Sequence, residues 1–340
     1  MAGRRNGRRG PSQGDLGPFR IGGGAVLITF WGTRGSIPAP LTWRDVEDKL
    51  LSLIFHLGGR RFSTPQDAQE YLATLPFFQR ATFGGNTPCV EVCWGDDRLI
   101  LDAGTGIRSL GKALMDGLAG KGQATLHILL SHTHWDHIMG FPFFEPAYVP
   151  GNQIVLYGGH EDLEARIRHQ QDPAHFPVSL EDMSADFFFV HLEVGRNYRI
   201  AGFSVEVLKQ FHPGASYGYR IQRKGRVLVY STDSEYERTD PDYLAKYTRF
   251  FRKADALIFD AQYSPSETVE KQNWGHSSAL IGVELALQAQ VKRLILFHHD
   301  PEADDERIQS HLEEAISYRD RKGGNGLEIL AAYDGMQIQL

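Results

Sequence analysis

Three histidines and one aspartate lie within the six-residue segment HTHWDH at positions 132–137. Neutral imidazole and carboxylate groups are ligands that suit zinc, iron and manganese. His132 and His134 are separated by one residue, so in extended backbone their side chains point the same way. Asp136 and His137 follow as the chain turns and can reach a second ion nearby. We interpret the segment as a metal site, because four ligand-type side chains this dense are rarely only solvated turn residues.

The sequence on either side indicates how this segment is positioned. Residues 126–130 form a short apolar run that is typical of a buried strand. Gly140 and Pro142 follow the segment and end any regular element. We therefore expect the cluster to lie on a loop at the end of a core strand, where a rigid scaffold aims side chains into a cleft.

The pattern His-x-His-x-Asp-His after a hydrophobic strand resembles the signature of the metallo-β-lactamase superfamily. The resemblance implies an α/β fold, a four-layer αββα sandwich with a metal site at the edge of its two sheets. Residues 30–38 look like the opening strand and loop of the phosphodiesterase and ribonuclease Z branch. Residues 102–106 resemble the first superfamily motif, in which Asp102 is implied to orient metal-bound imidazoles rather than to bind the metal itself.

The resemblance also implies three further ligands far along the chain, and the sequence offers one after each of three predicted strands. They are His212, Asp233 and His298, with His299 as the alternative to His298. The two oxygens of a carboxylate at position 233 can bridge two cations. In the superfamily, a bridging aspartate at this place fits phosphodiesterases and glyoxalase II-like hydrolases.

Residues 273–279 open a predicted helix and carry a further resemblance. They are similar to the Gly-His-Ser-Thr motif of ribonuclease Z and related phosphodiesterases, with Ser278 in place of threonine. This similarity implies that His276 contacts a phosphate oxygen or protonates a leaving group.

Together these motifs predict a dinuclear, metal-dependent hydrolase. The expected cofactors are two divalent ions, zinc in first place and manganese as the alternative. Metal-bound hydroxide would attack phosphorus in line while His276 donates a proton to the departing oxygen, so Asp136 and His276 are the expected catalytic residues. The first ion is expected to be held by His132, His134 and His212, the second by Asp136, His137 and His298, with Asp233 bridging them.

The composition of the 340 residues is that of an ordinary globular protein, with 41% hydrophobic and 23% charged residues. A net charge of -6 argues against a surface built mainly to hold duplex nucleic acid. Cys89 and Cys93 are expected on one face of a strand, too stretched for an easy disulfide, which favours reduced thiols and a cytoplasmic location. No apolar run predicts a membrane span, and no signal peptide is apparent.

The chain divides into a tail and one large domain. Residues 1–24 are rich in glycine and arginine, which predicts a disordered tail. Residues 25–340 are expected to form the hydrolase domain, with a helical insertion at about 41–80 and a lid or partner surface at about 160–190. The insertion can cover the cleft, form a dimer surface or decorate the fold, and the sequence leaves these three roles open.

The predicted function is hydrolysis of a cyclic nucleotide or another small phosphodiester. Its supports are Asp233, the motif at His276 and the aromatic residues of 141–148, whose rings can stack on a base or pack in the core. A tRNA 3′-end endonuclease is an alternative that the arginine-rich tail favours, whereas the net charge and the lack of a long Gly- and Lys-rich arm oppose it. A thioester or lactone hydrolase is the third class. We also expect a homodimer without a membrane partner.

Overall fold

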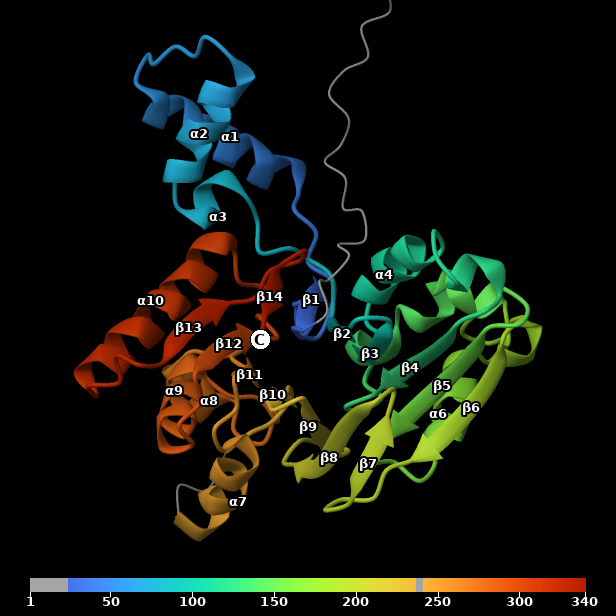
Figure 1. Ribbon diagram of the computed structural model, residues 1–340. Helices are drawn as coiled ribbons and strands as arrows, with labels where there is room; N and C mark the ends of the chain where they lie inside the picture. The colour runs from blue at the N-terminus through green and yellow to red at the C-terminus, as the bar shows by residue number, and fades with distance from the viewer. Residues whose placement is uncertain (1–23, 237–240) are drawn as a thin grey trace, which may run out of the picture.

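The computed structural model describes residues 24–236 and 241–340. The predicted tail therefore lies outside the described residues, apart from Gly24. In the described residues, two mixed sheets of seven strands each form the centre of the molecule (Figure 1). The first sheet contains, in spatial order, β14 (Gln337–Gln339), β1 (Leu27–Gly32), β2 (Cys89–Trp94), β3 (Asp97–Leu101), β4 (Thr125–Leu129), β5 (Gln153–Gly158) and β6 (Asp186–His191).

The second sheet has the same number of strands and contains the parallel core of the carboxy-terminal half. Its order is β13 (Glu328–Ala331), β12 (Arg293–Phe297), β11 (Ala256–Asp260), β10 (Arg226–Ser231), β9 (Ser216–Arg223), β8 (Phe203–Gln210) and β7 (Asn197–Ile200). Strands β10 to β13 run parallel to one another, and every residue of β11 is buried. The apolar run 256–259 before Asp260 predicts this buried strand, because a parallel strand covered on both faces is continuously apolar.

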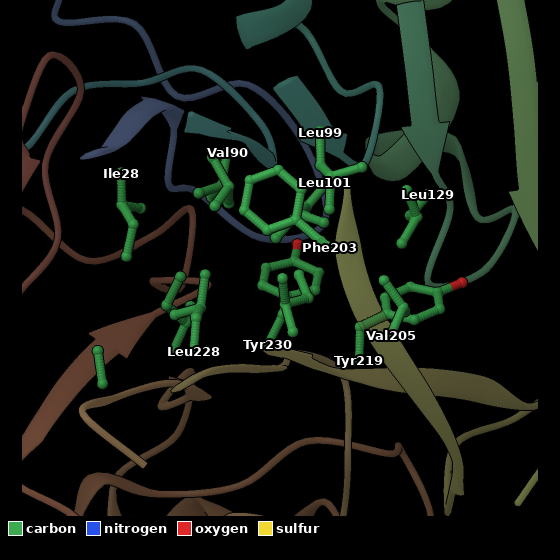
Figure 2. Close-up of a cluster of buried hydrophobic side chains, with 14 of the residues drawn as sticks. Ile28, Val90, Leu99, Leu101, Leu129, Phe203, Val205, Tyr219, Leu228 and Tyr230 are labelled. Atoms are coloured by element: carbon green, nitrogen blue, oxygen red, sulfur yellow. The ribbon is translucent and has the colours of Figure 1, made fainter. Parts of the chain in front are cut away.

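The two sheets pack face to face around one apolar cluster. Figure 2 shows Ile28 and Leu99 of the first sheet opposite Tyr219, Leu228 and Tyr230 of the second. The side chains of each strand alternate between this inner layer and an outer layer, so each sheet also offers an outer apolar face.

Helices cover both outer faces. The first sheet is covered by α4 (Gly106–Leu114), α5 (Trp135–Ile138) and α6 (Leu163–Gln170), and the second by α7 (Pro241–Phe251), α9 (Ala279–Gln288) and α10 (Asp305–Arg321). The remaining helices of the body are α8 (Pro265–Glu270), η1 (Ala119–Lys121), η2 (Phe141–Phe143), η3 (Glu145–Tyr148) and η4 (Leu180–Asp182). The predicted four-layer αββα sandwich is confirmed.

The insertion forms three helices, α1 (Trp43–Leu57), α2 (Pro65–Thr74) and α3 (Phe77–Arg80), which lie beyond α10 in Figure 1. The helical spacing of apolar residues such as Val46, Leu50 and Ile54, followed by Gly58, predicts a helix from Trp43 to Leu57. The structure confirms these bounds for α1, and Gly58 ends it with a φ of 54°. Thr64 before Pro65 predicts a second helix start, and in the structure Thr64 caps α2 in a capping box with Asp67. None of the three helices contains a buried residue.

The structure decides between the two alternatives that the sequence leaves open for the aromatic residues of 141–148. The aromatic segment divides, because Phe141 and Phe144 are fully buried against the first sheet whereas Phe143 and Tyr148 are partly exposed. Core packing, one of the two predicted alternatives, is therefore confirmed for Phe141 and Phe144. Cys89 and Cys93 are both free and buried, as expected. Within the described ranges, no helix combines the length and apolarity needed to cross a bilayer.

Candidate metal centre

The side chains predicted to bind metal come from the ends of four strands. His132 and His134 follow β4, His212 follows β8, Asp233 follows β10 and His298 follows β12. Strands β10, β11 and β12 are parallel, so their carboxyl ends meet at one edge of the second sheet. The loop after β4 lies against this edge, since the Tyr217 N–H donates to the Ser131 carbonyl at 2.9 Å.

Four overlapping groups of ligand-type atoms result among the described residues, with these atoms within 4.8 Å of one another in each, and two of the groups join His276 to other residues of the site. The remaining two groups contain the predicted metal ligands. One group contains His132, His134 and His212, and the other contains Asp136, His137, Asp233 and His298. The segment 132–137 was expected to be a loop, but Asp136 and His137 lie on the one-turn helix α5. This turn separates their side chains from those of His132 and His134 and so supplies the two groups.

Asp233 lies between the two groups. Its Oδ1 is 3.1 Å from His137 Nε2 and 3.3 Å from His298 Nε2. Its Oδ2 is 3.7 Å from His132 Nε2 and 3.8 Å from His212 Nε2. One carboxylate oxygen thus faces each group.

Three residues of the site have a strained backbone conformation. Asp102, Asp233 and His298 adopt φ values of 60°, 32° and 60°. A non-glycine residue in this left-handed region costs about 1–3 kcal/mol and persists only where its surroundings hold it. The arrangement of these side chains is therefore stabilised by the whole site rather than by local preference.

Asp102 holds His137 from behind. The Asp102 carboxylate accepts hydrogen bonds from His137 Nδ1 at 2.8 Å, the Ser131 N–H at 2.6 Å, the Ser131 hydroxyl at 2.8 Å and the Tyr230 hydroxyl at 2.7 Å. A proton on Nδ1 leaves the lone pair of Nε2 pointing into the site.

Two other histidines are oriented in the same way. His212 Nδ1 lies 2.9 Å from the Gly275 carbonyl, and His298 Nδ1 lies 3.0 Å from Gln262 Oε1. Gly275 has a φ of 87°, and a Cβ there would lie 2.2 Å from His212 Nδ1. Only glycine fits this position, because any side chain would displace the imidazole.

From the sequence, Asp260 at the end of the predicted strand 256–260 can either support the metal ligands or cap the following loop, and the structure gives it both roles. Its Oδ2 lies 2.9 Å from His276 Nδ1, so it orients that ring. It also accepts the Gln262 N–H at 3.1 Å and the Ser234 N–H at 3.2 Å, which holds the loops after β10 and β11 together. Burial alone would lower the pKa of His276, but the charge of Asp260 and a hydrogen bond to it raise this pKa to about 9.

Burial and mutual repulsion keep the first group of histidines neutral. Burial and the neighbouring His137 lower the pKa of His132 well below its usual value, and burial lowers that of His134 to about 4. Burial opposes ionisation of Asp136 and Asp233, but His137 outweighs it and holds both pKa values well below normal. The carboxylates in turn raise the pKa of His137 well above its usual value, so this imidazole carries the positive charge that balances them. A divalent cation bound here would supply that positive charge instead and would leave His137 as a neutral ligand beside ionised carboxylates.

The fit to a metal ion is also supported by one buried nitrogen. Among the described residues, His132 Nε2 is buried without a hydrogen-bond partner, because Asp233 Oδ2 at 3.7 Å is too distant. An unpaired buried nitrogen is costly unless its lone pair binds something. The His/Asp cluster therefore fits a divalent-metal site.

The histidine after β12 that faces the site is His298. His299 instead directs Nε2 to the Ala332 carbonyl at 2.9 Å, and burial lowers its pKa to about 3. His160, His169, His175 and His191 belong to none of the ligand groups found in the described part of the chain.

Three supporting residues were not recognised from the sequence. Gln262 contacts His298, the Tyr230 hydroxyl donates to Asp102, and Glu235 accepts the N–H groups of Asn273 and Gly275 at 3.0 and 2.9 Å. Of the three, Gln262 has the clearest sequence signal, since it lies two residues after Asp260 at the end of a predicted strand. Nothing in the local sequence around Tyr230 or Glu235 indicates the distant partner.

Residues 97–299 match the family described as the beta-lactamase superfamily domain. A ribonuclease Z of Exiguobacterium sibiricum is 28% identical over 211 residues, which cover 50% of this chain and 70% of the relative. A ribonuclease Z of Picrophilus torridus is 37% identical over 229 residues, covering 53% of this chain and 70% of the relative. The metallo-beta-lactamase fold protein YhfI of Bacillus subtilis superposes with a TM-score of 0.60 at 16% identity, over 93% of this chain and 100% of YhfI.

Proposed function

The chain belongs to the β-lactamase superfamily, in its ribonuclease Z-like branch, and from this premise we propose that it is a phosphodiesterase that uses two divalent cations. The predicted family and the predicted class of enzyme, a metal-dependent hydrolase, are confirmed. The number and identity of the ions, the role of each residue and the substrate belong to the proposal.

The position of Asp233 is the observation that carries the proposal. Because its two oxygens face separate ligand groups, it is suited to bridge two ions. Two bound cations would lower the pKa of a coordinated water and offset negative charge on the phosphoryl oxygens. The proposed ligands are His132, His134 and His212 for one ion and Asp136, His137 and His298 for the other, with Asp233 shared. Zinc suits this nitrogen and oxygen set, and manganese is the alternative.

His276 is proposed to protonate the departing oxygen. Asp260 occupies its Nδ1, which leaves Nε2 as the atom that can transfer a proton. The alkoxide that leaves a phosphodiester is a strong base and benefits from this proton, whereas a thiolate leaves without one. The pair formed by His276 and Asp260 therefore favours phosphodiesters over thioesters.

The surroundings of the site favour a small substrate such as a cyclic nucleotide. Trp135 and Trp274 are 59% and 62% exposed, and each is adjacent in the chain to a residue of the site. Exposed indole rings can stack on a base. The segment between β5 and β6, which is described throughout, contains only the short helices α6 and η4. This is consistent with the absence of a long arm for holding a tRNA.

Cleavage at the 3′ end of a tRNA precursor is the second candidate. The observation that favours it is the sequence identity of 28% and 37% to two proteins named ribonuclease Z. The net charge of -6 opposes it, because RNA binding depends on many cationic contacts to phosphate.

A substrate panel distinguishes these functions. It contains bis-p-nitrophenyl phosphate, cyclic mononucleotides, a tRNA precursor, a thioester and a lactone, each assayed with zinc and with manganese. Hydrolysis of cyclic mononucleotides without cleavage of the tRNA precursor supports the proposal. Cleavage of the precursor alone supports the second candidate, and activity confined to the thioester or lactone contradicts both.

The His276→Ala variant tests the leaving-group role. The p-nitrophenolate ion departs without a proton, so the variant should lose much more activity on a cyclic nucleotide than on bis-p-nitrophenyl phosphate. Equal losses on both substrates would exclude proton donation by His276. Full activity on both would remove His276 from the mechanism.

A further inference from the structure

Helix α1 presents its polar side to the body of the protein. A groove of about 430 Å³ separates it from residues 301–306, and the α1 residues that line the groove are Asp45, Asp48, Lys49 and Ser52. Lys49 Nζ donates to the Phe78 carbonyl at 2.5 Å and lies 2.9 Å from the Asp305 carboxylate. A surface helix of a globular protein normally packs its apolar side on the body, so this orientation is inverted.

Much of the remaining surface of α1 is apolar and exposed. It carries what we call the α1 patch, which consists of Trp43, Val46, Leu50, Leu51, Ile54 and Phe55. These side chains are 45–83% exposed. Four of them, at positions 43, 46, 50 and 54, follow the spacing of three and four residues that makes one stripe on a helix.

The size of the α1 patch matches that of an interface between proteins. At about 150–250 Å² for a large side chain, six side chains with these exposed fractions present on the order of 700 Å². The largest apolar patch of a typical monomer is about 300–600 Å² and is often itself a binding surface. A standard interface buries about 800 Å² on each partner.

The charges beside the patch identify the kind of partner. Arg44 and Lys49 are balanced by Asp45, Glu47 and Asp48, so the charged residues of α1 have no basic excess. Binding to RNA or to an anionic membrane surface would require an excess of basic residues. A second copy of the chain requires only a complementary apolar surface, and closed two-fold symmetry is the commonest form of association.

We propose that the α1 patch is the interface of a homodimer in which two α1 helices pack antiparallel. If the two-fold axis passes beside Leu50, this residue contacts the partner's Leu50. Val46 then faces the partner's Ile54, and Trp43 faces the partner's Leu57. Apolar side chains meet apolar side chains along the whole stripe, while the polar side of each helix stays on its own body. The proposal is independent of the substrate.

A cysteine at the proposed axis provides the sharpest test. Cys89 and Cys93 are buried, so the natural chain offers no surface thiol among its described residues. Helix axes about 8–10 Å apart bring facing backbones within reach of a disulfide. After mild oxidation, Leu50→Cys should run mainly as a covalent dimer on a non-reducing gel. Ser52→Cys, on the groove side of the same helix, should remain a single chain.

Solution mass tests the interface without a cross-link. The wild-type chain at tens of micromolar should have twice the mass of one 38.2 kDa chain by light scattering. The double variant Leu50→Lys/Ile54→Lys should have the mass of one chain with an unchanged circular dichroism spectrum, because both side chains are exposed. A wild-type mass of one chain would overturn the proposal, as would a double variant that remains dimeric. A monomer that dimerises only when residues 1–23 are removed would assign the patch to the chain's own tail instead.

Discussion

The metal centre and the helical insertion are held in place by different kinds of interaction. In the centre, His137, His212 and His298 are each oriented by a partner between 35 and 63 residues away along the chain. In the insertion, Thr64 and Asp67 cap α2 from three residues apart, and α1 and α2 contain no buried residue. The centre depends on tertiary contacts, whereas α2 depends on its immediate neighbours. The insertion as a whole joins the body through α1 and α3, in contacts such as the ion pair of Lys49 with Asp305 and the packing of Phe77 on Tyr333.

This difference has a consequence for substitutions. Removing one member of the centre leaves buried polar groups without partners and moves ligand atoms, so the effects should be large and should reach metal binding. Removing one local contact in the insertion should affect that helix and leave the hydrolytic site unchanged. Four substitutions test this contrast.

The largest effect is expected from Asp233→Asn. Asparagine tolerates the φ of 32° at this position but lacks the negative charge that faces both ligand groups. Hydrolysis should fall by more than about 100-fold and the metal content should fall with it, since even residues behind the ligands contribute 10–100-fold. Metal analysis and an assay with bis-p-nitrophenyl phosphate measure both. Asp96→Ala in the exposed turn between β2 and β3 is the control, and an Asp233→Asn protein with normal metal content would contradict the bridging role.

A smaller effect is expected from Gln262→Ala. The substitution removes the oxygen that accepts from His298 Nδ1, so metal affinity or activity should fall by about 10–100-fold. Gln262→Glu keeps an acceptor at this position and should retain more of both. If the two variants behave alike, Gln262 does not act through His298.

Tyr230→Phe should lower stability while sparing the fold. It deletes one of the four donors to the buried Asp102 carboxylate, and a hydrogen bond to a charged group contributes about 1.5–3 kcal/mol. The free energy of unfolding, measured in urea, should fall by about 2 kcal/mol. Tyr333→Phe, at a partly exposed position whose hydroxyl has no hydrogen-bond partner among the described residues, should change it by less than about 0.5 kcal/mol. If the two variants lose the same free energy of unfolding, the hydrogen bond from Tyr230 to Asp102 makes no special contribution to stability.

The smallest effect is expected from Thr64→Ala in the insertion. Loss of the cap should weaken α2 alone, so its amide hydrogens should exchange about fivefold faster. Hydrolysis and the urea midpoint of the body should stay at wild-type values, and Ser63→Ala provides the neighbouring control. A shift of the midpoint would mean that the insertion and the body unfold together, which would remove the contrast between the two regions.

Whether the sequence predicts an element of this structure depends on how far apart in the chain the residues that stabilise the element are. The bounds of α1, the cap of α2 and the buried strand β11 were predictable, because each depends on neighbouring residues or on a continuous apolar run. The short strands β6, β7 and β14 were not, because strands of this kind are completed by pairing with distant segments. Phe141 and Phe144 were equally ambiguous, since an apolar ring has the same sequence signature in a core and in a binding pocket.

The sequence by itself determined the superfamily, the class of reaction and the residues that come together at the metal centre, because ligand chemistry constrains residue type and spacing. Only the tertiary structure decided between His298 and His299, gave Asp260 both of its roles, and revealed Gln262, Tyr230 and Glu235 as supports. It also showed that the apolar side of α1 faces outward. These are questions of direction, and the direction of a side chain is set by partners that lie far away along the chain.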